Sequence, residues 1–173
     1  LNLRFSTVNF NGSRTFYIDL SQVASIVNRR FYRQGLNWGV SRFKILSADP
    51  STVGAVTISK LPNTWVMSGA WHKSFATWMK MNREALEDSP SVRPRFLDFK
   101  VYADSTHHQA GFVANLLPNS LSGTALPGEW ESSKIVVPFG PASPGNTAEF
   151  EVVATGINYP GVSAATAFNA VSL

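Results

Sequence analysis

The clearest pattern in the chain is a pair of extended apolar runs joined by a short turn. The first run, residues 36–48, mixes aliphatic and aromatic residues with Arg42 and Lys44. The second run, residues 53–59, alternates β-branched or small residues with polar ones. Between them lies the tetrapeptide 49–52 (DPST), whose proline fixes φ for a tight turn. Two such runs on either side of a turn predict an antiparallel β-hairpin.

Further strands are predicted where apolar and polar residues alternate between Gly, Pro and Asn turns. They cover residues 1–10, 14–18, 96–103, 134–139, 148–155 and 164–172, with a weaker candidate at 112–116. The rest of the stretch from 104 to 128 is predicted to be loop.

Two short helices interrupt the strands. Asp19 is a candidate N-cap with Gln22 three residues later, as in a capping box, and apolar spacing then predicts a helix over 20–29. Ser68 can cap a second helix that ends before Ser89-Pro90. Four residues share one face of this helix: Trp71, Phe75, Trp78 and Met79. The two tryptophans are expected in the core.

The order of these elements favours an all-β fold. Strands separated by turns, without βαβ alternation, are typical of an antiparallel sandwich or barrel. The preferred architecture is a single eight-stranded antiparallel jelly-roll sandwich with two inserted helices. At 173 residues the chain suits one domain spanning 1–173.

Composition narrows the class of protein. Apolar residues make up 44 % of the chain, which excludes a wholly disordered polymer. Cysteine is absent, so disulfides, thiolate metal sites and cysteine nucleophiles are excluded. Charged residues make up only 15 %, against about 25 % in typical domains. Either much of the exterior meets a partner, or Ser, Thr and Asn supply the polar surface.

The net charge of +4 is distributed unevenly along the chain. Residues 1–60 contain eight basic and two acidic residues, a net charge of +6, whereas residues 61–173 contain seven basic and nine acidic residues, a net charge of −2. A basic first third indicates a polyanionic partner, nucleic acid before a membrane, because no basic amphipathic helix is present.

Candidate catalytic and metal-binding groups are weakly organised. No G-x-S-x-G elbow accompanies the three histidines, His72, His107 and His108. Adjacent histidines on a strand would point to opposite faces, and no further ligand cluster lies near them in sequence. Two carboxylate pairs, Glu129/Glu131 and Glu149/Glu151, each fall on one strand face, whereas glycosidases usually draw their two carboxylates from separate elements. We therefore expect no enzyme activity and no cofactor or metal.

The basic cluster is the strongest candidate binding site. Arg29, Arg30 and Arg33 alternate with Phe31 and Tyr32, which combines phosphate-pairing cations with faces on which bases can stack. Alternatively, the two rings anchor the segment after the helix while the arginines form structural ion pairs. Three further cations complete the candidate nucleic-acid-binding set: Arg4, Arg42 and Lys44.

Several stretches resemble the capsid proteins of small circular Rep-encoding single-stranded DNA viruses. They are YIDLSQ (17–22), NRRFYRQGLNW (28–38), VSRFKILSA (40–48), TVGAVTISKLPNTW (52–65), WHKSFATWMKMNR (71–83) and RFLDFKVYAD (95–104). The chain is also similar to the shell domains of small positive-strand RNA virus coats. Such coats usually carry an arginine-rich arm before the first strand, which this sequence lacks. Either the arm lies outside this sequence, or packaging rests on the basic residues above.

The resemblance implies a structural protein that assembles into an icosahedral shell of 60 copies or a multiple of 60. The shell would enclose viral nucleic acid through non-specific phosphate contacts from a basic inner face, without a membrane partner. The protein would lie in the virion, and inside the host cell during assembly. Two alternatives remain open: a carbohydrate-binding β-sandwich with Trp65 or Trp130 stacking on sugars, and a cellular nucleic-acid-binding β-barrel.

Overall fold

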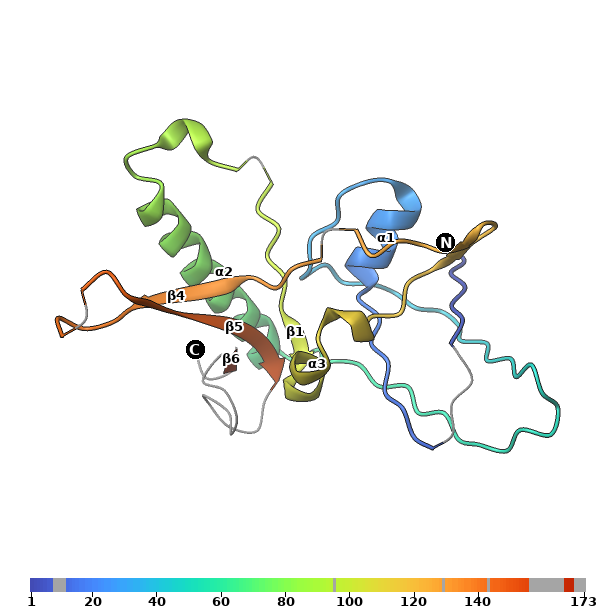
Figure 1. Ribbon diagram of the computed structural model, residues 1–173. Helices are drawn as coiled ribbons and strands as arrows, with labels where there is room; N and C mark the ends of the chain where they lie inside the picture. Colours follow the sequence, from blue (N-terminus) through green and yellow to red (C-terminus); the bar gives the residue numbers. More distant parts are fainter. Residues whose placement is uncertain (8–11, 95, 129, 143, 156–166, 170–173) are drawn as a thin grey trace.

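The computed structural model describes residues 1–7, 12–94, 96–128, 130–142, 144–155 and 167–169. Its centre is a mixed sheet around the strand β5 (Thr147–Thr155) (Figure 1). One edge of β5 pairs antiparallel with β4 (Lys134–Pro138) and, further along, parallel with β1 (Tyr102–Asp104). The opposite edge pairs parallel with β6 (Ala167–Asn169). A separate two-stranded ribbon joins β2 (Asn119–Ser120) to β3 (Gly123–Thr124).

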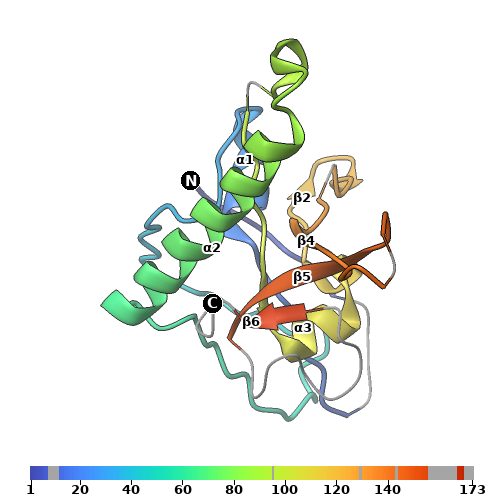
Figure 2. The same cartoon turned by 90° about the vertical axis from the view of Figure 1, so that its left-hand side faces the viewer.

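The sheet carries a hydrophobic cluster on each face. Val152 and Val153 are neighbours on β5 and point to opposite faces, as successive strand residues do. Val152 joins a cluster around the fully buried Phe99, against which the long helix α2 (Trp65–Ala85) packs (Figure 2). Val153 joins Tyr102 and Trp130 on the other face.

Helix α2 is formed as the pattern predicted, with a different start. Thr64 is the N-cap and accepts a hydrogen bond from the Met67 N–H at 3.3 Å, so the helix begins three residues before the predicted cap Ser68. Trp71, Phe75 and Trp78 lie on one face, each with its ring centroid within 5.7 Å of the Phe99 ring. The expectation that both tryptophans belong to the core is confirmed.

Helix α1 (Leu20–Asn28) confirms the first predicted helix and its cap. The Asp19 carboxylate accepts hydrogen bonds from the backbone N–H groups of Ser21 and Gln22. Gln22 does not close a capping box, because its side-chain amide donates instead to the Pro127 carbonyl at 2.9 Å. Asp19 also accepts from the Trp130 indole at 2.9 Å and from the Gln34 amide at 2.7 Å. One carboxylate therefore connects the start of α1 to two distant parts of the chain.

Of the predicted strand 96–103, only the end joins the sheet, as part of β1. Before β1, the backbone bonds to side chains and not to a neighbouring strand. The Gln34 side chain occupies the position of a neighbouring strand, since its Oε1 accepts from the Val101 N–H at 2.8 Å. Gly35 follows at a φ of +92°, and a Cβ there would lie 2.7 Å from the Trp71 ring. A glycine is needed at this position for both its positive φ and the close approach to α2.

Three short helices connect the remaining elements. α3 (Ser105–Ala110) is capped by Asp104, which accepts from the His107 N–H at 2.7 Å. The other two are 3₁₀ turns, η1 (Pro90–Val92) and η2 (Phe112–Ala114). α3 forms where loop was predicted, and η2 forms where the weak strand 112–116 was predicted. No helix among the described residues is both long and apolar enough to cross a membrane.

The predicted eight-stranded jelly-roll sandwich is wrong. Within the described residues, strands form one small mixed sheet and one short ribbon, accompanied by α1, α2 and α3. The reason is visible at the core, where the aromatic face of α2 covers the side of the sheet that a second sheet would need. Residues 1–7 form no strand, and the predicted strand 14–18 is reduced to a single bridge between Tyr17 and Asn115.

The predicted strands 134–139 and 148–155 are confirmed by β4 and β5 within a residue at each end. The predicted strand 164–172 is confirmed at β6, and its other residues lie outside the described part of the chain, as do residues 8–10 of the first predicted strand.

The predicted hairpin in residues 36–63, hereafter the open segment, is also wrong, although its turn is confirmed. The Thr52 N–H donates to the Asp49 carbonyl at 3.2 Å, and the Asp49 carboxylate accepts from the Ser51 N–H at 2.8 Å. The two flanking runs form no strand, and every residue of the open segment is exposed. Figure 1 shows it extending away from the sheet at the lower right.

Candidate nucleic-acid interface

Two neighbouring arginines, Arg29 and Arg30, directly follow α1 and are exposed to solvent. Arg29 is the C-cap, and its N–H donates to the Ser25 carbonyl. Arg29 has a φ of +51° and is the one non-glycine residue with positive φ in the described chain. This left-handed position usually holds glycine, because a side chain there costs about 1–2 kcal/mol. An arginine kept in such a conformation points to a role for its side chain.

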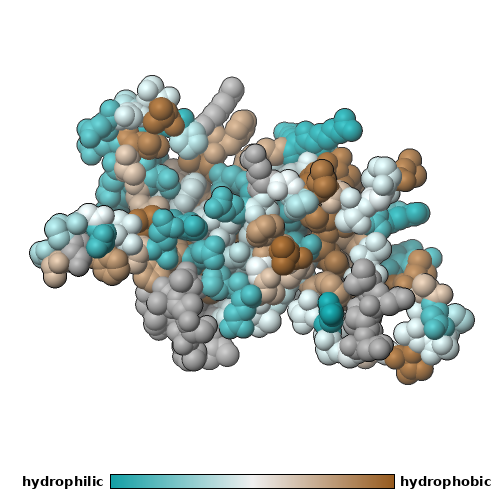
Figure 3. Space-filling model, in the orientation of Figure 1, coloured by the Kyte–Doolittle hydropathy of each residue, from teal (hydrophilic) through white to brown (hydrophobic). Residues whose placement is uncertain are grey.

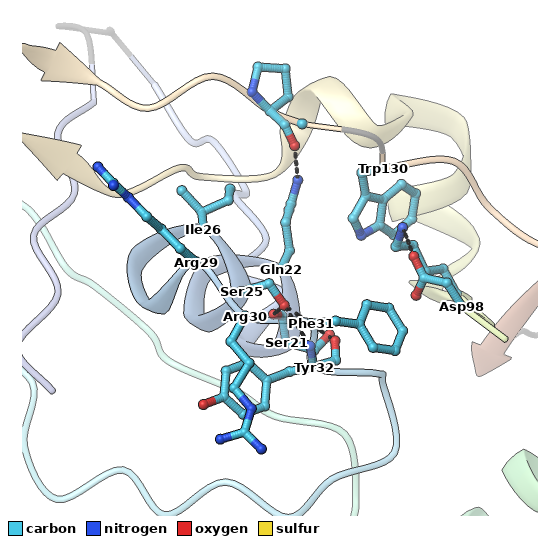
Figure 4. Close-up of a pocket in the computed structure, with 13 residues that line it drawn as sticks. Ser21, Gln22, Ser25, Ile26, Arg29, Arg30, Phe31, Tyr32, Asp98 and Trp130 are labelled. Atoms are coloured by element: carbon cyan, nitrogen blue, oxygen red, sulfur yellow. Dashed lines mark hydrogen bonds and ion pairs between the residues drawn. The ribbon is translucent and has the colours of Figure 1, made fainter. Parts of the chain in front are cut away.

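A cavity of about 360 Å³ opens beside this helix end. Its walls come from one face of α1, from residues 29–32, from Asp98 and Lys100, and from Pro127, Gly128 and Trp130. Figure 4 shows Phe31, Asp98 and Trp130 on one side of the helix end, while Arg29 and Arg30 extend from it in two different directions. The cavity thus combines aromatic surface with cationic groups.

The charges around the cavity are mostly basic. Asp98 and Lys100 form an ion pair with each other, so among the described lining residues Arg29 and Arg30 leave a net charge of +2. The Arg30 guanidinium lies 5.8 Å from the centroid of the Tyr32 ring, a cation–π contact. Neither arginine forms an ion pair with any acidic side chain that the structure describes. Within the described part of the chain, the alternative of arginines fixed in structural ion pairs is therefore not observed for these two.

The other predicted binding residues are distributed elsewhere. Arg33 lies with its guanidinium 4.8 Å from the centroid of the Phe75 ring, where it covers the α2 core. Arg42 and Lys44 are exposed on the open segment, and neither lines the cavity. The backbone carbonyl of Arg4 accepts from the Asn119 N–H at 2.7 Å, beside the β2–β3 ribbon. The structure therefore joins Arg29 and Arg30 in one site and separates the other four.

An aromatic contact links the cavity to the open segment. The Tyr32 and Trp38 rings meet edge to face with centroids 5.6 Å apart. Trp38 leads directly to the exposed residues Arg42, Phe43 and Lys44. Cationic and aromatic side chains therefore extend from the cavity into the open segment.

Sequence reasoning did not place Lys100, Asp98 or Trp130 in this site. Lys100 and Asp98 lie in a run that the pattern assigned to an ordinary strand, and Trp130 lies about 100 residues from Arg29 in sequence. Trp130 is only 4 % exposed and its indole donates to Asp19. Local pattern carries no information on such distant contacts.

His107 belongs to a buried polar cluster beside Trp130, whereas His72 is exposed on α2. His107 Nδ1 accepts from the Ala103 N–H at 3.1 Å, so the ring proton lies on Nε2, which faces the Asn115 Oδ1 at 2.6 Å. The ring stacks on Tyr17 with centroids 4.0 Å apart. The Tyr17 hydroxyl donates to Asp104, and burial, followed by the charge of Asp104, raises the pKa of Tyr17 to about 12. Every polar atom of the His107 ring is occupied, which makes the cluster structural.

We expect this cluster to make stability depend on pH. Burial lowers the pKa of His107, against the smaller opposing effects of its bond to Asn115 and of the charges on Asp104 and Asp19. As the pH falls, the unfolded chain therefore takes up a proton on this histidine at a higher pH than the folded chain does. The free energy of unfolding is greatest above about pH 6.5 and declines as the pH falls below that value. Urea denaturation at pH 7.5 and 5.5 measures the decline.

The matched variants are His107→Gln, which removes the titrating group, and His72→Gln on the exposed side of α2. The decline between the two pH values is expected to shrink only in the first variant, because His108 and its partner Glu151 remain in both. An unchanged decline in His107→Gln would contradict this assignment.

The carboxylates considered for catalysis are engaged in other bonds. Glu149 pairs with Lys134 at 3.1 Å. Glu151 contacts His108 at 2.7 Å and accepts from the Ser132 hydroxyl. Glu129 lies outside the described residues. No group of three His, Asp or Glu side chains in the described chain is arranged to hold a metal ion.

Among known proteins, no family, curated sequence or solved structure matches the chain. The resemblance to viral coat proteins therefore stays a prediction.

Proposed function

We propose that this chain is a non-enzymatic coat-forming protein that binds single-stranded nucleic acid without sequence specificity and assembles with copies of itself into a closed shell. The observation that carries the proposal is the pair Arg29–Arg30 beside the aromatic cavity, where neither arginine forms an ion pair with a described acidic residue. Because the fold is not a jelly roll, the support comes from surface chemistry and not from architecture.

The basic surface suits a flexible polyanion. Guanidinium groups form bidentate bonds with phosphates, and rings such as Phe31 offer faces on which any base can stack. Phe31 is 43 % exposed, so its ring is accessible from solvent. Binding of this kind depends on counterion release and carries little sequence preference.

The open segment supports self-association. Its large apolar side chains are 38 to 98 % exposed: Leu36, Trp38, Val40, Phe43, Ile45, Leu46, Val53, Val56, Ile58 and Leu61. Figure 3 shows apolar side chains at the surface on the right-hand end of the molecule, where this segment lies. Apart from the turn at 49–52, its backbone forms no hydrogen bonds with the rest of the described chain. Exposed apolar residues on an unpaired extended backbone are the usual substrate for pairing between chains.

The function is tested by electron microscopy of the purified protein after size exclusion, with absorbance read at 260 and 280 nm. Closed particles with a raised 260/280 ratio are expected. A species of 18.9 kDa that neither forms particles nor binds an oligonucleotide would overturn the proposal.

Polar substitutions in the open segment are expected to prevent assembly without loss of folding. The triple variant Phe43→Gln/Ile45→Gln/Leu46→Gln removes apolar surface that is already exposed in the single chain, so its free energy of unfolding should stay within about 0.5 kcal/mol of the parent. Its mass by light scattering should fall to that of the monomer. Leu121→Gln, at a still more exposed leucine in the turn between β2 and β3, is the control and should assemble normally. Unchanged assembly in the triple variant would exclude the open segment as the interface.

The carbohydrate-binding alternative is weakened by the positions of its two tryptophans. Trp130 is buried and bonded to Asp19, so its ring is not free to stack on a sugar. Trp65 alone is exposed, at 86 %, at the first turn of α2. The β-sandwich that this alternative requires is not the observed fold.

A further inference from the structure

We infer that the cavity beside α1 accommodates a single unpaired nucleobase, whose flanking phosphates are held by Arg29 and Arg30. This inference rests on the proposed nucleic-acid binding and deepens it, because it assigns the base and the phosphates to separate parts of one site. The ligand class is a nucleotide unit, free or within a single strand.

The volume of the cavity and the exposed fractions of its aromatic side chains fit this ligand. A volume of about 360 Å³ lies within the range of about 300–1,000 Å³ typical of small-molecule sites. Exposure increases from Trp130 at 4 % to Phe31 at 43 %, so Trp130 is at the inner wall and Phe31 at the mouth. A flat ring entering the cavity would stack on the exposed surface of Phe31, while the almost fully buried Trp130 bounds the inner end.

The polar groups of the cavity fit the edge of a base. Asp98 supplies carboxylate oxygens that accept hydrogen bonds from an exocyclic amine or a ring N–H. Lys100, paired with Asp98, neutralises the carboxylate, which therefore repels the phosphates less. Tyr32 contacts Arg30 and Trp38, and Phe31 contacts the Phe96 ring with centroids 5.4 Å apart. Phe31 remains 43 % exposed, so it is the stacking ring offered at the mouth.

The two arginines fit the backbone on either side of the base. They are consecutive, they leave the helix end in different directions, and each is exposed (Figure 4). The left-handed φ of Arg29 redirects the chain between them. A strand that inserts one base into the cavity would place its adjacent phosphates toward the two guanidinium groups.

The test compares two fluorescent strands of equal length and charge, one of thymidylate and one of abasic deoxyribose phosphate, by anisotropy at several salt concentrations. The natural strand is expected to bind about tenfold more tightly, since stacking of one base contributes to that extent. Phe31→Ala should abolish the preference for bases and leave the salt dependence unchanged. Trp65→Ala removes an exposed aromatic residue outside the cavity and should preserve the preference.

A second experiment uses the parent protein and free mononucleotides, so its result does not depend on the length of a bound strand. Free deoxyadenosine monophosphate should compete with the thymidylate strand at concentrations where deoxyribose 5-phosphate does not. Equal binding of natural and abasic strands would overturn the inference while the proposed function stands, because backbone binding is retained. Absence of binding by either strand would overturn both.

Discussion

The double variant Arg29→Gly/Arg30→Ala is expected to bind a single-stranded oligonucleotide about 100-fold more weakly at low salt. Each arginine contributes a charged hydrogen bond to phosphate worth about 1.5–3 kcal/mol, and 1.4 kcal/mol corresponds to a factor of ten. The slope of log affinity against log salt should also decrease, by about 0.7 for each phosphate that the variant no longer neutralises. Fluorescence anisotropy over a salt series measures both quantities.

Glycine at position 29 separates binding from folding. Because Arg29 has a φ of +51°, glycine relieves backbone strain there, and the variant should be as stable as the parent or slightly more stable. The control Lys73→Ala/Arg83→Ala removes the same charge from the exposed side of α2 and should lower affinity much less. Equal losses in the two double variants would show that net charge alone attracts the strand, and that α1 carries no site.

Asp19→Ala is expected to reduce the free energy of unfolding by about 3 kcal/mol. Loss of a helix N-cap costs about 1 kcal/mol. The variant also leaves the buried Trp130 indole N–H without its acceptor, which costs about 1–3 kcal/mol more. Since Trp130 forms the inner wall of the cavity, oligonucleotide affinity should fall in the same variant. Urea denaturation followed by tryptophan fluorescence measures the stability.

Asp19→Asn distinguishes the two roles of this carboxylate. Asparagine caps helices about as well as aspartate, but its amide has a single acceptor oxygen. That oxygen cannot both cap α1, as Oδ1 does, and accept from Gln34 and Trp130, as Oδ2 does. An intermediate loss is therefore expected. Asp49→Ala removes a similar turn-capping carboxylate at an exposed position and should change stability by less than about 0.5 kcal/mol. A loss in Asp19→Ala no larger than in Asp49→Ala would contradict the connecting role of Asp19.

The connection between site and core follows from these contacts. The same carboxylate caps the helix that carries Arg29 and holds the tryptophan that lines the cavity. Arg33, four residues after Arg29, instead covers the α2 core through Phe75. Neighbouring arginines in one sequence cluster are therefore assigned to different tasks, which sequence spacing alone does not distinguish.

The sequence by itself determined the elements whose signals are local. The Asp19 cap and apolar spacing specified α1, the aromatic stripe specified α2, and alternation specified β4 and β5. The turn at 49–52 formed because proline and aspartate act within four residues. The same local pattern identified Arg29, Arg30 and Phe31 as one cluster.

The tertiary structure decided which runs became strands and what completed the site. A strand requires a neighbour, and local alternation does not state whether one is available. The runs at 36–48 and 53–59 pair neither with each other nor with the sheet, and their apolar side chains remain at the surface. Lys100 and Trp130 line the same cavity as Arg29 only because the chain folds. Gln34 bonds to Val101, next to Lys100, and Asp19 bonds to Trp130, 111 residues away in sequence. Periodicity encodes which face of an element is apolar, whereas the partner of that face is selected by packing of the whole chain.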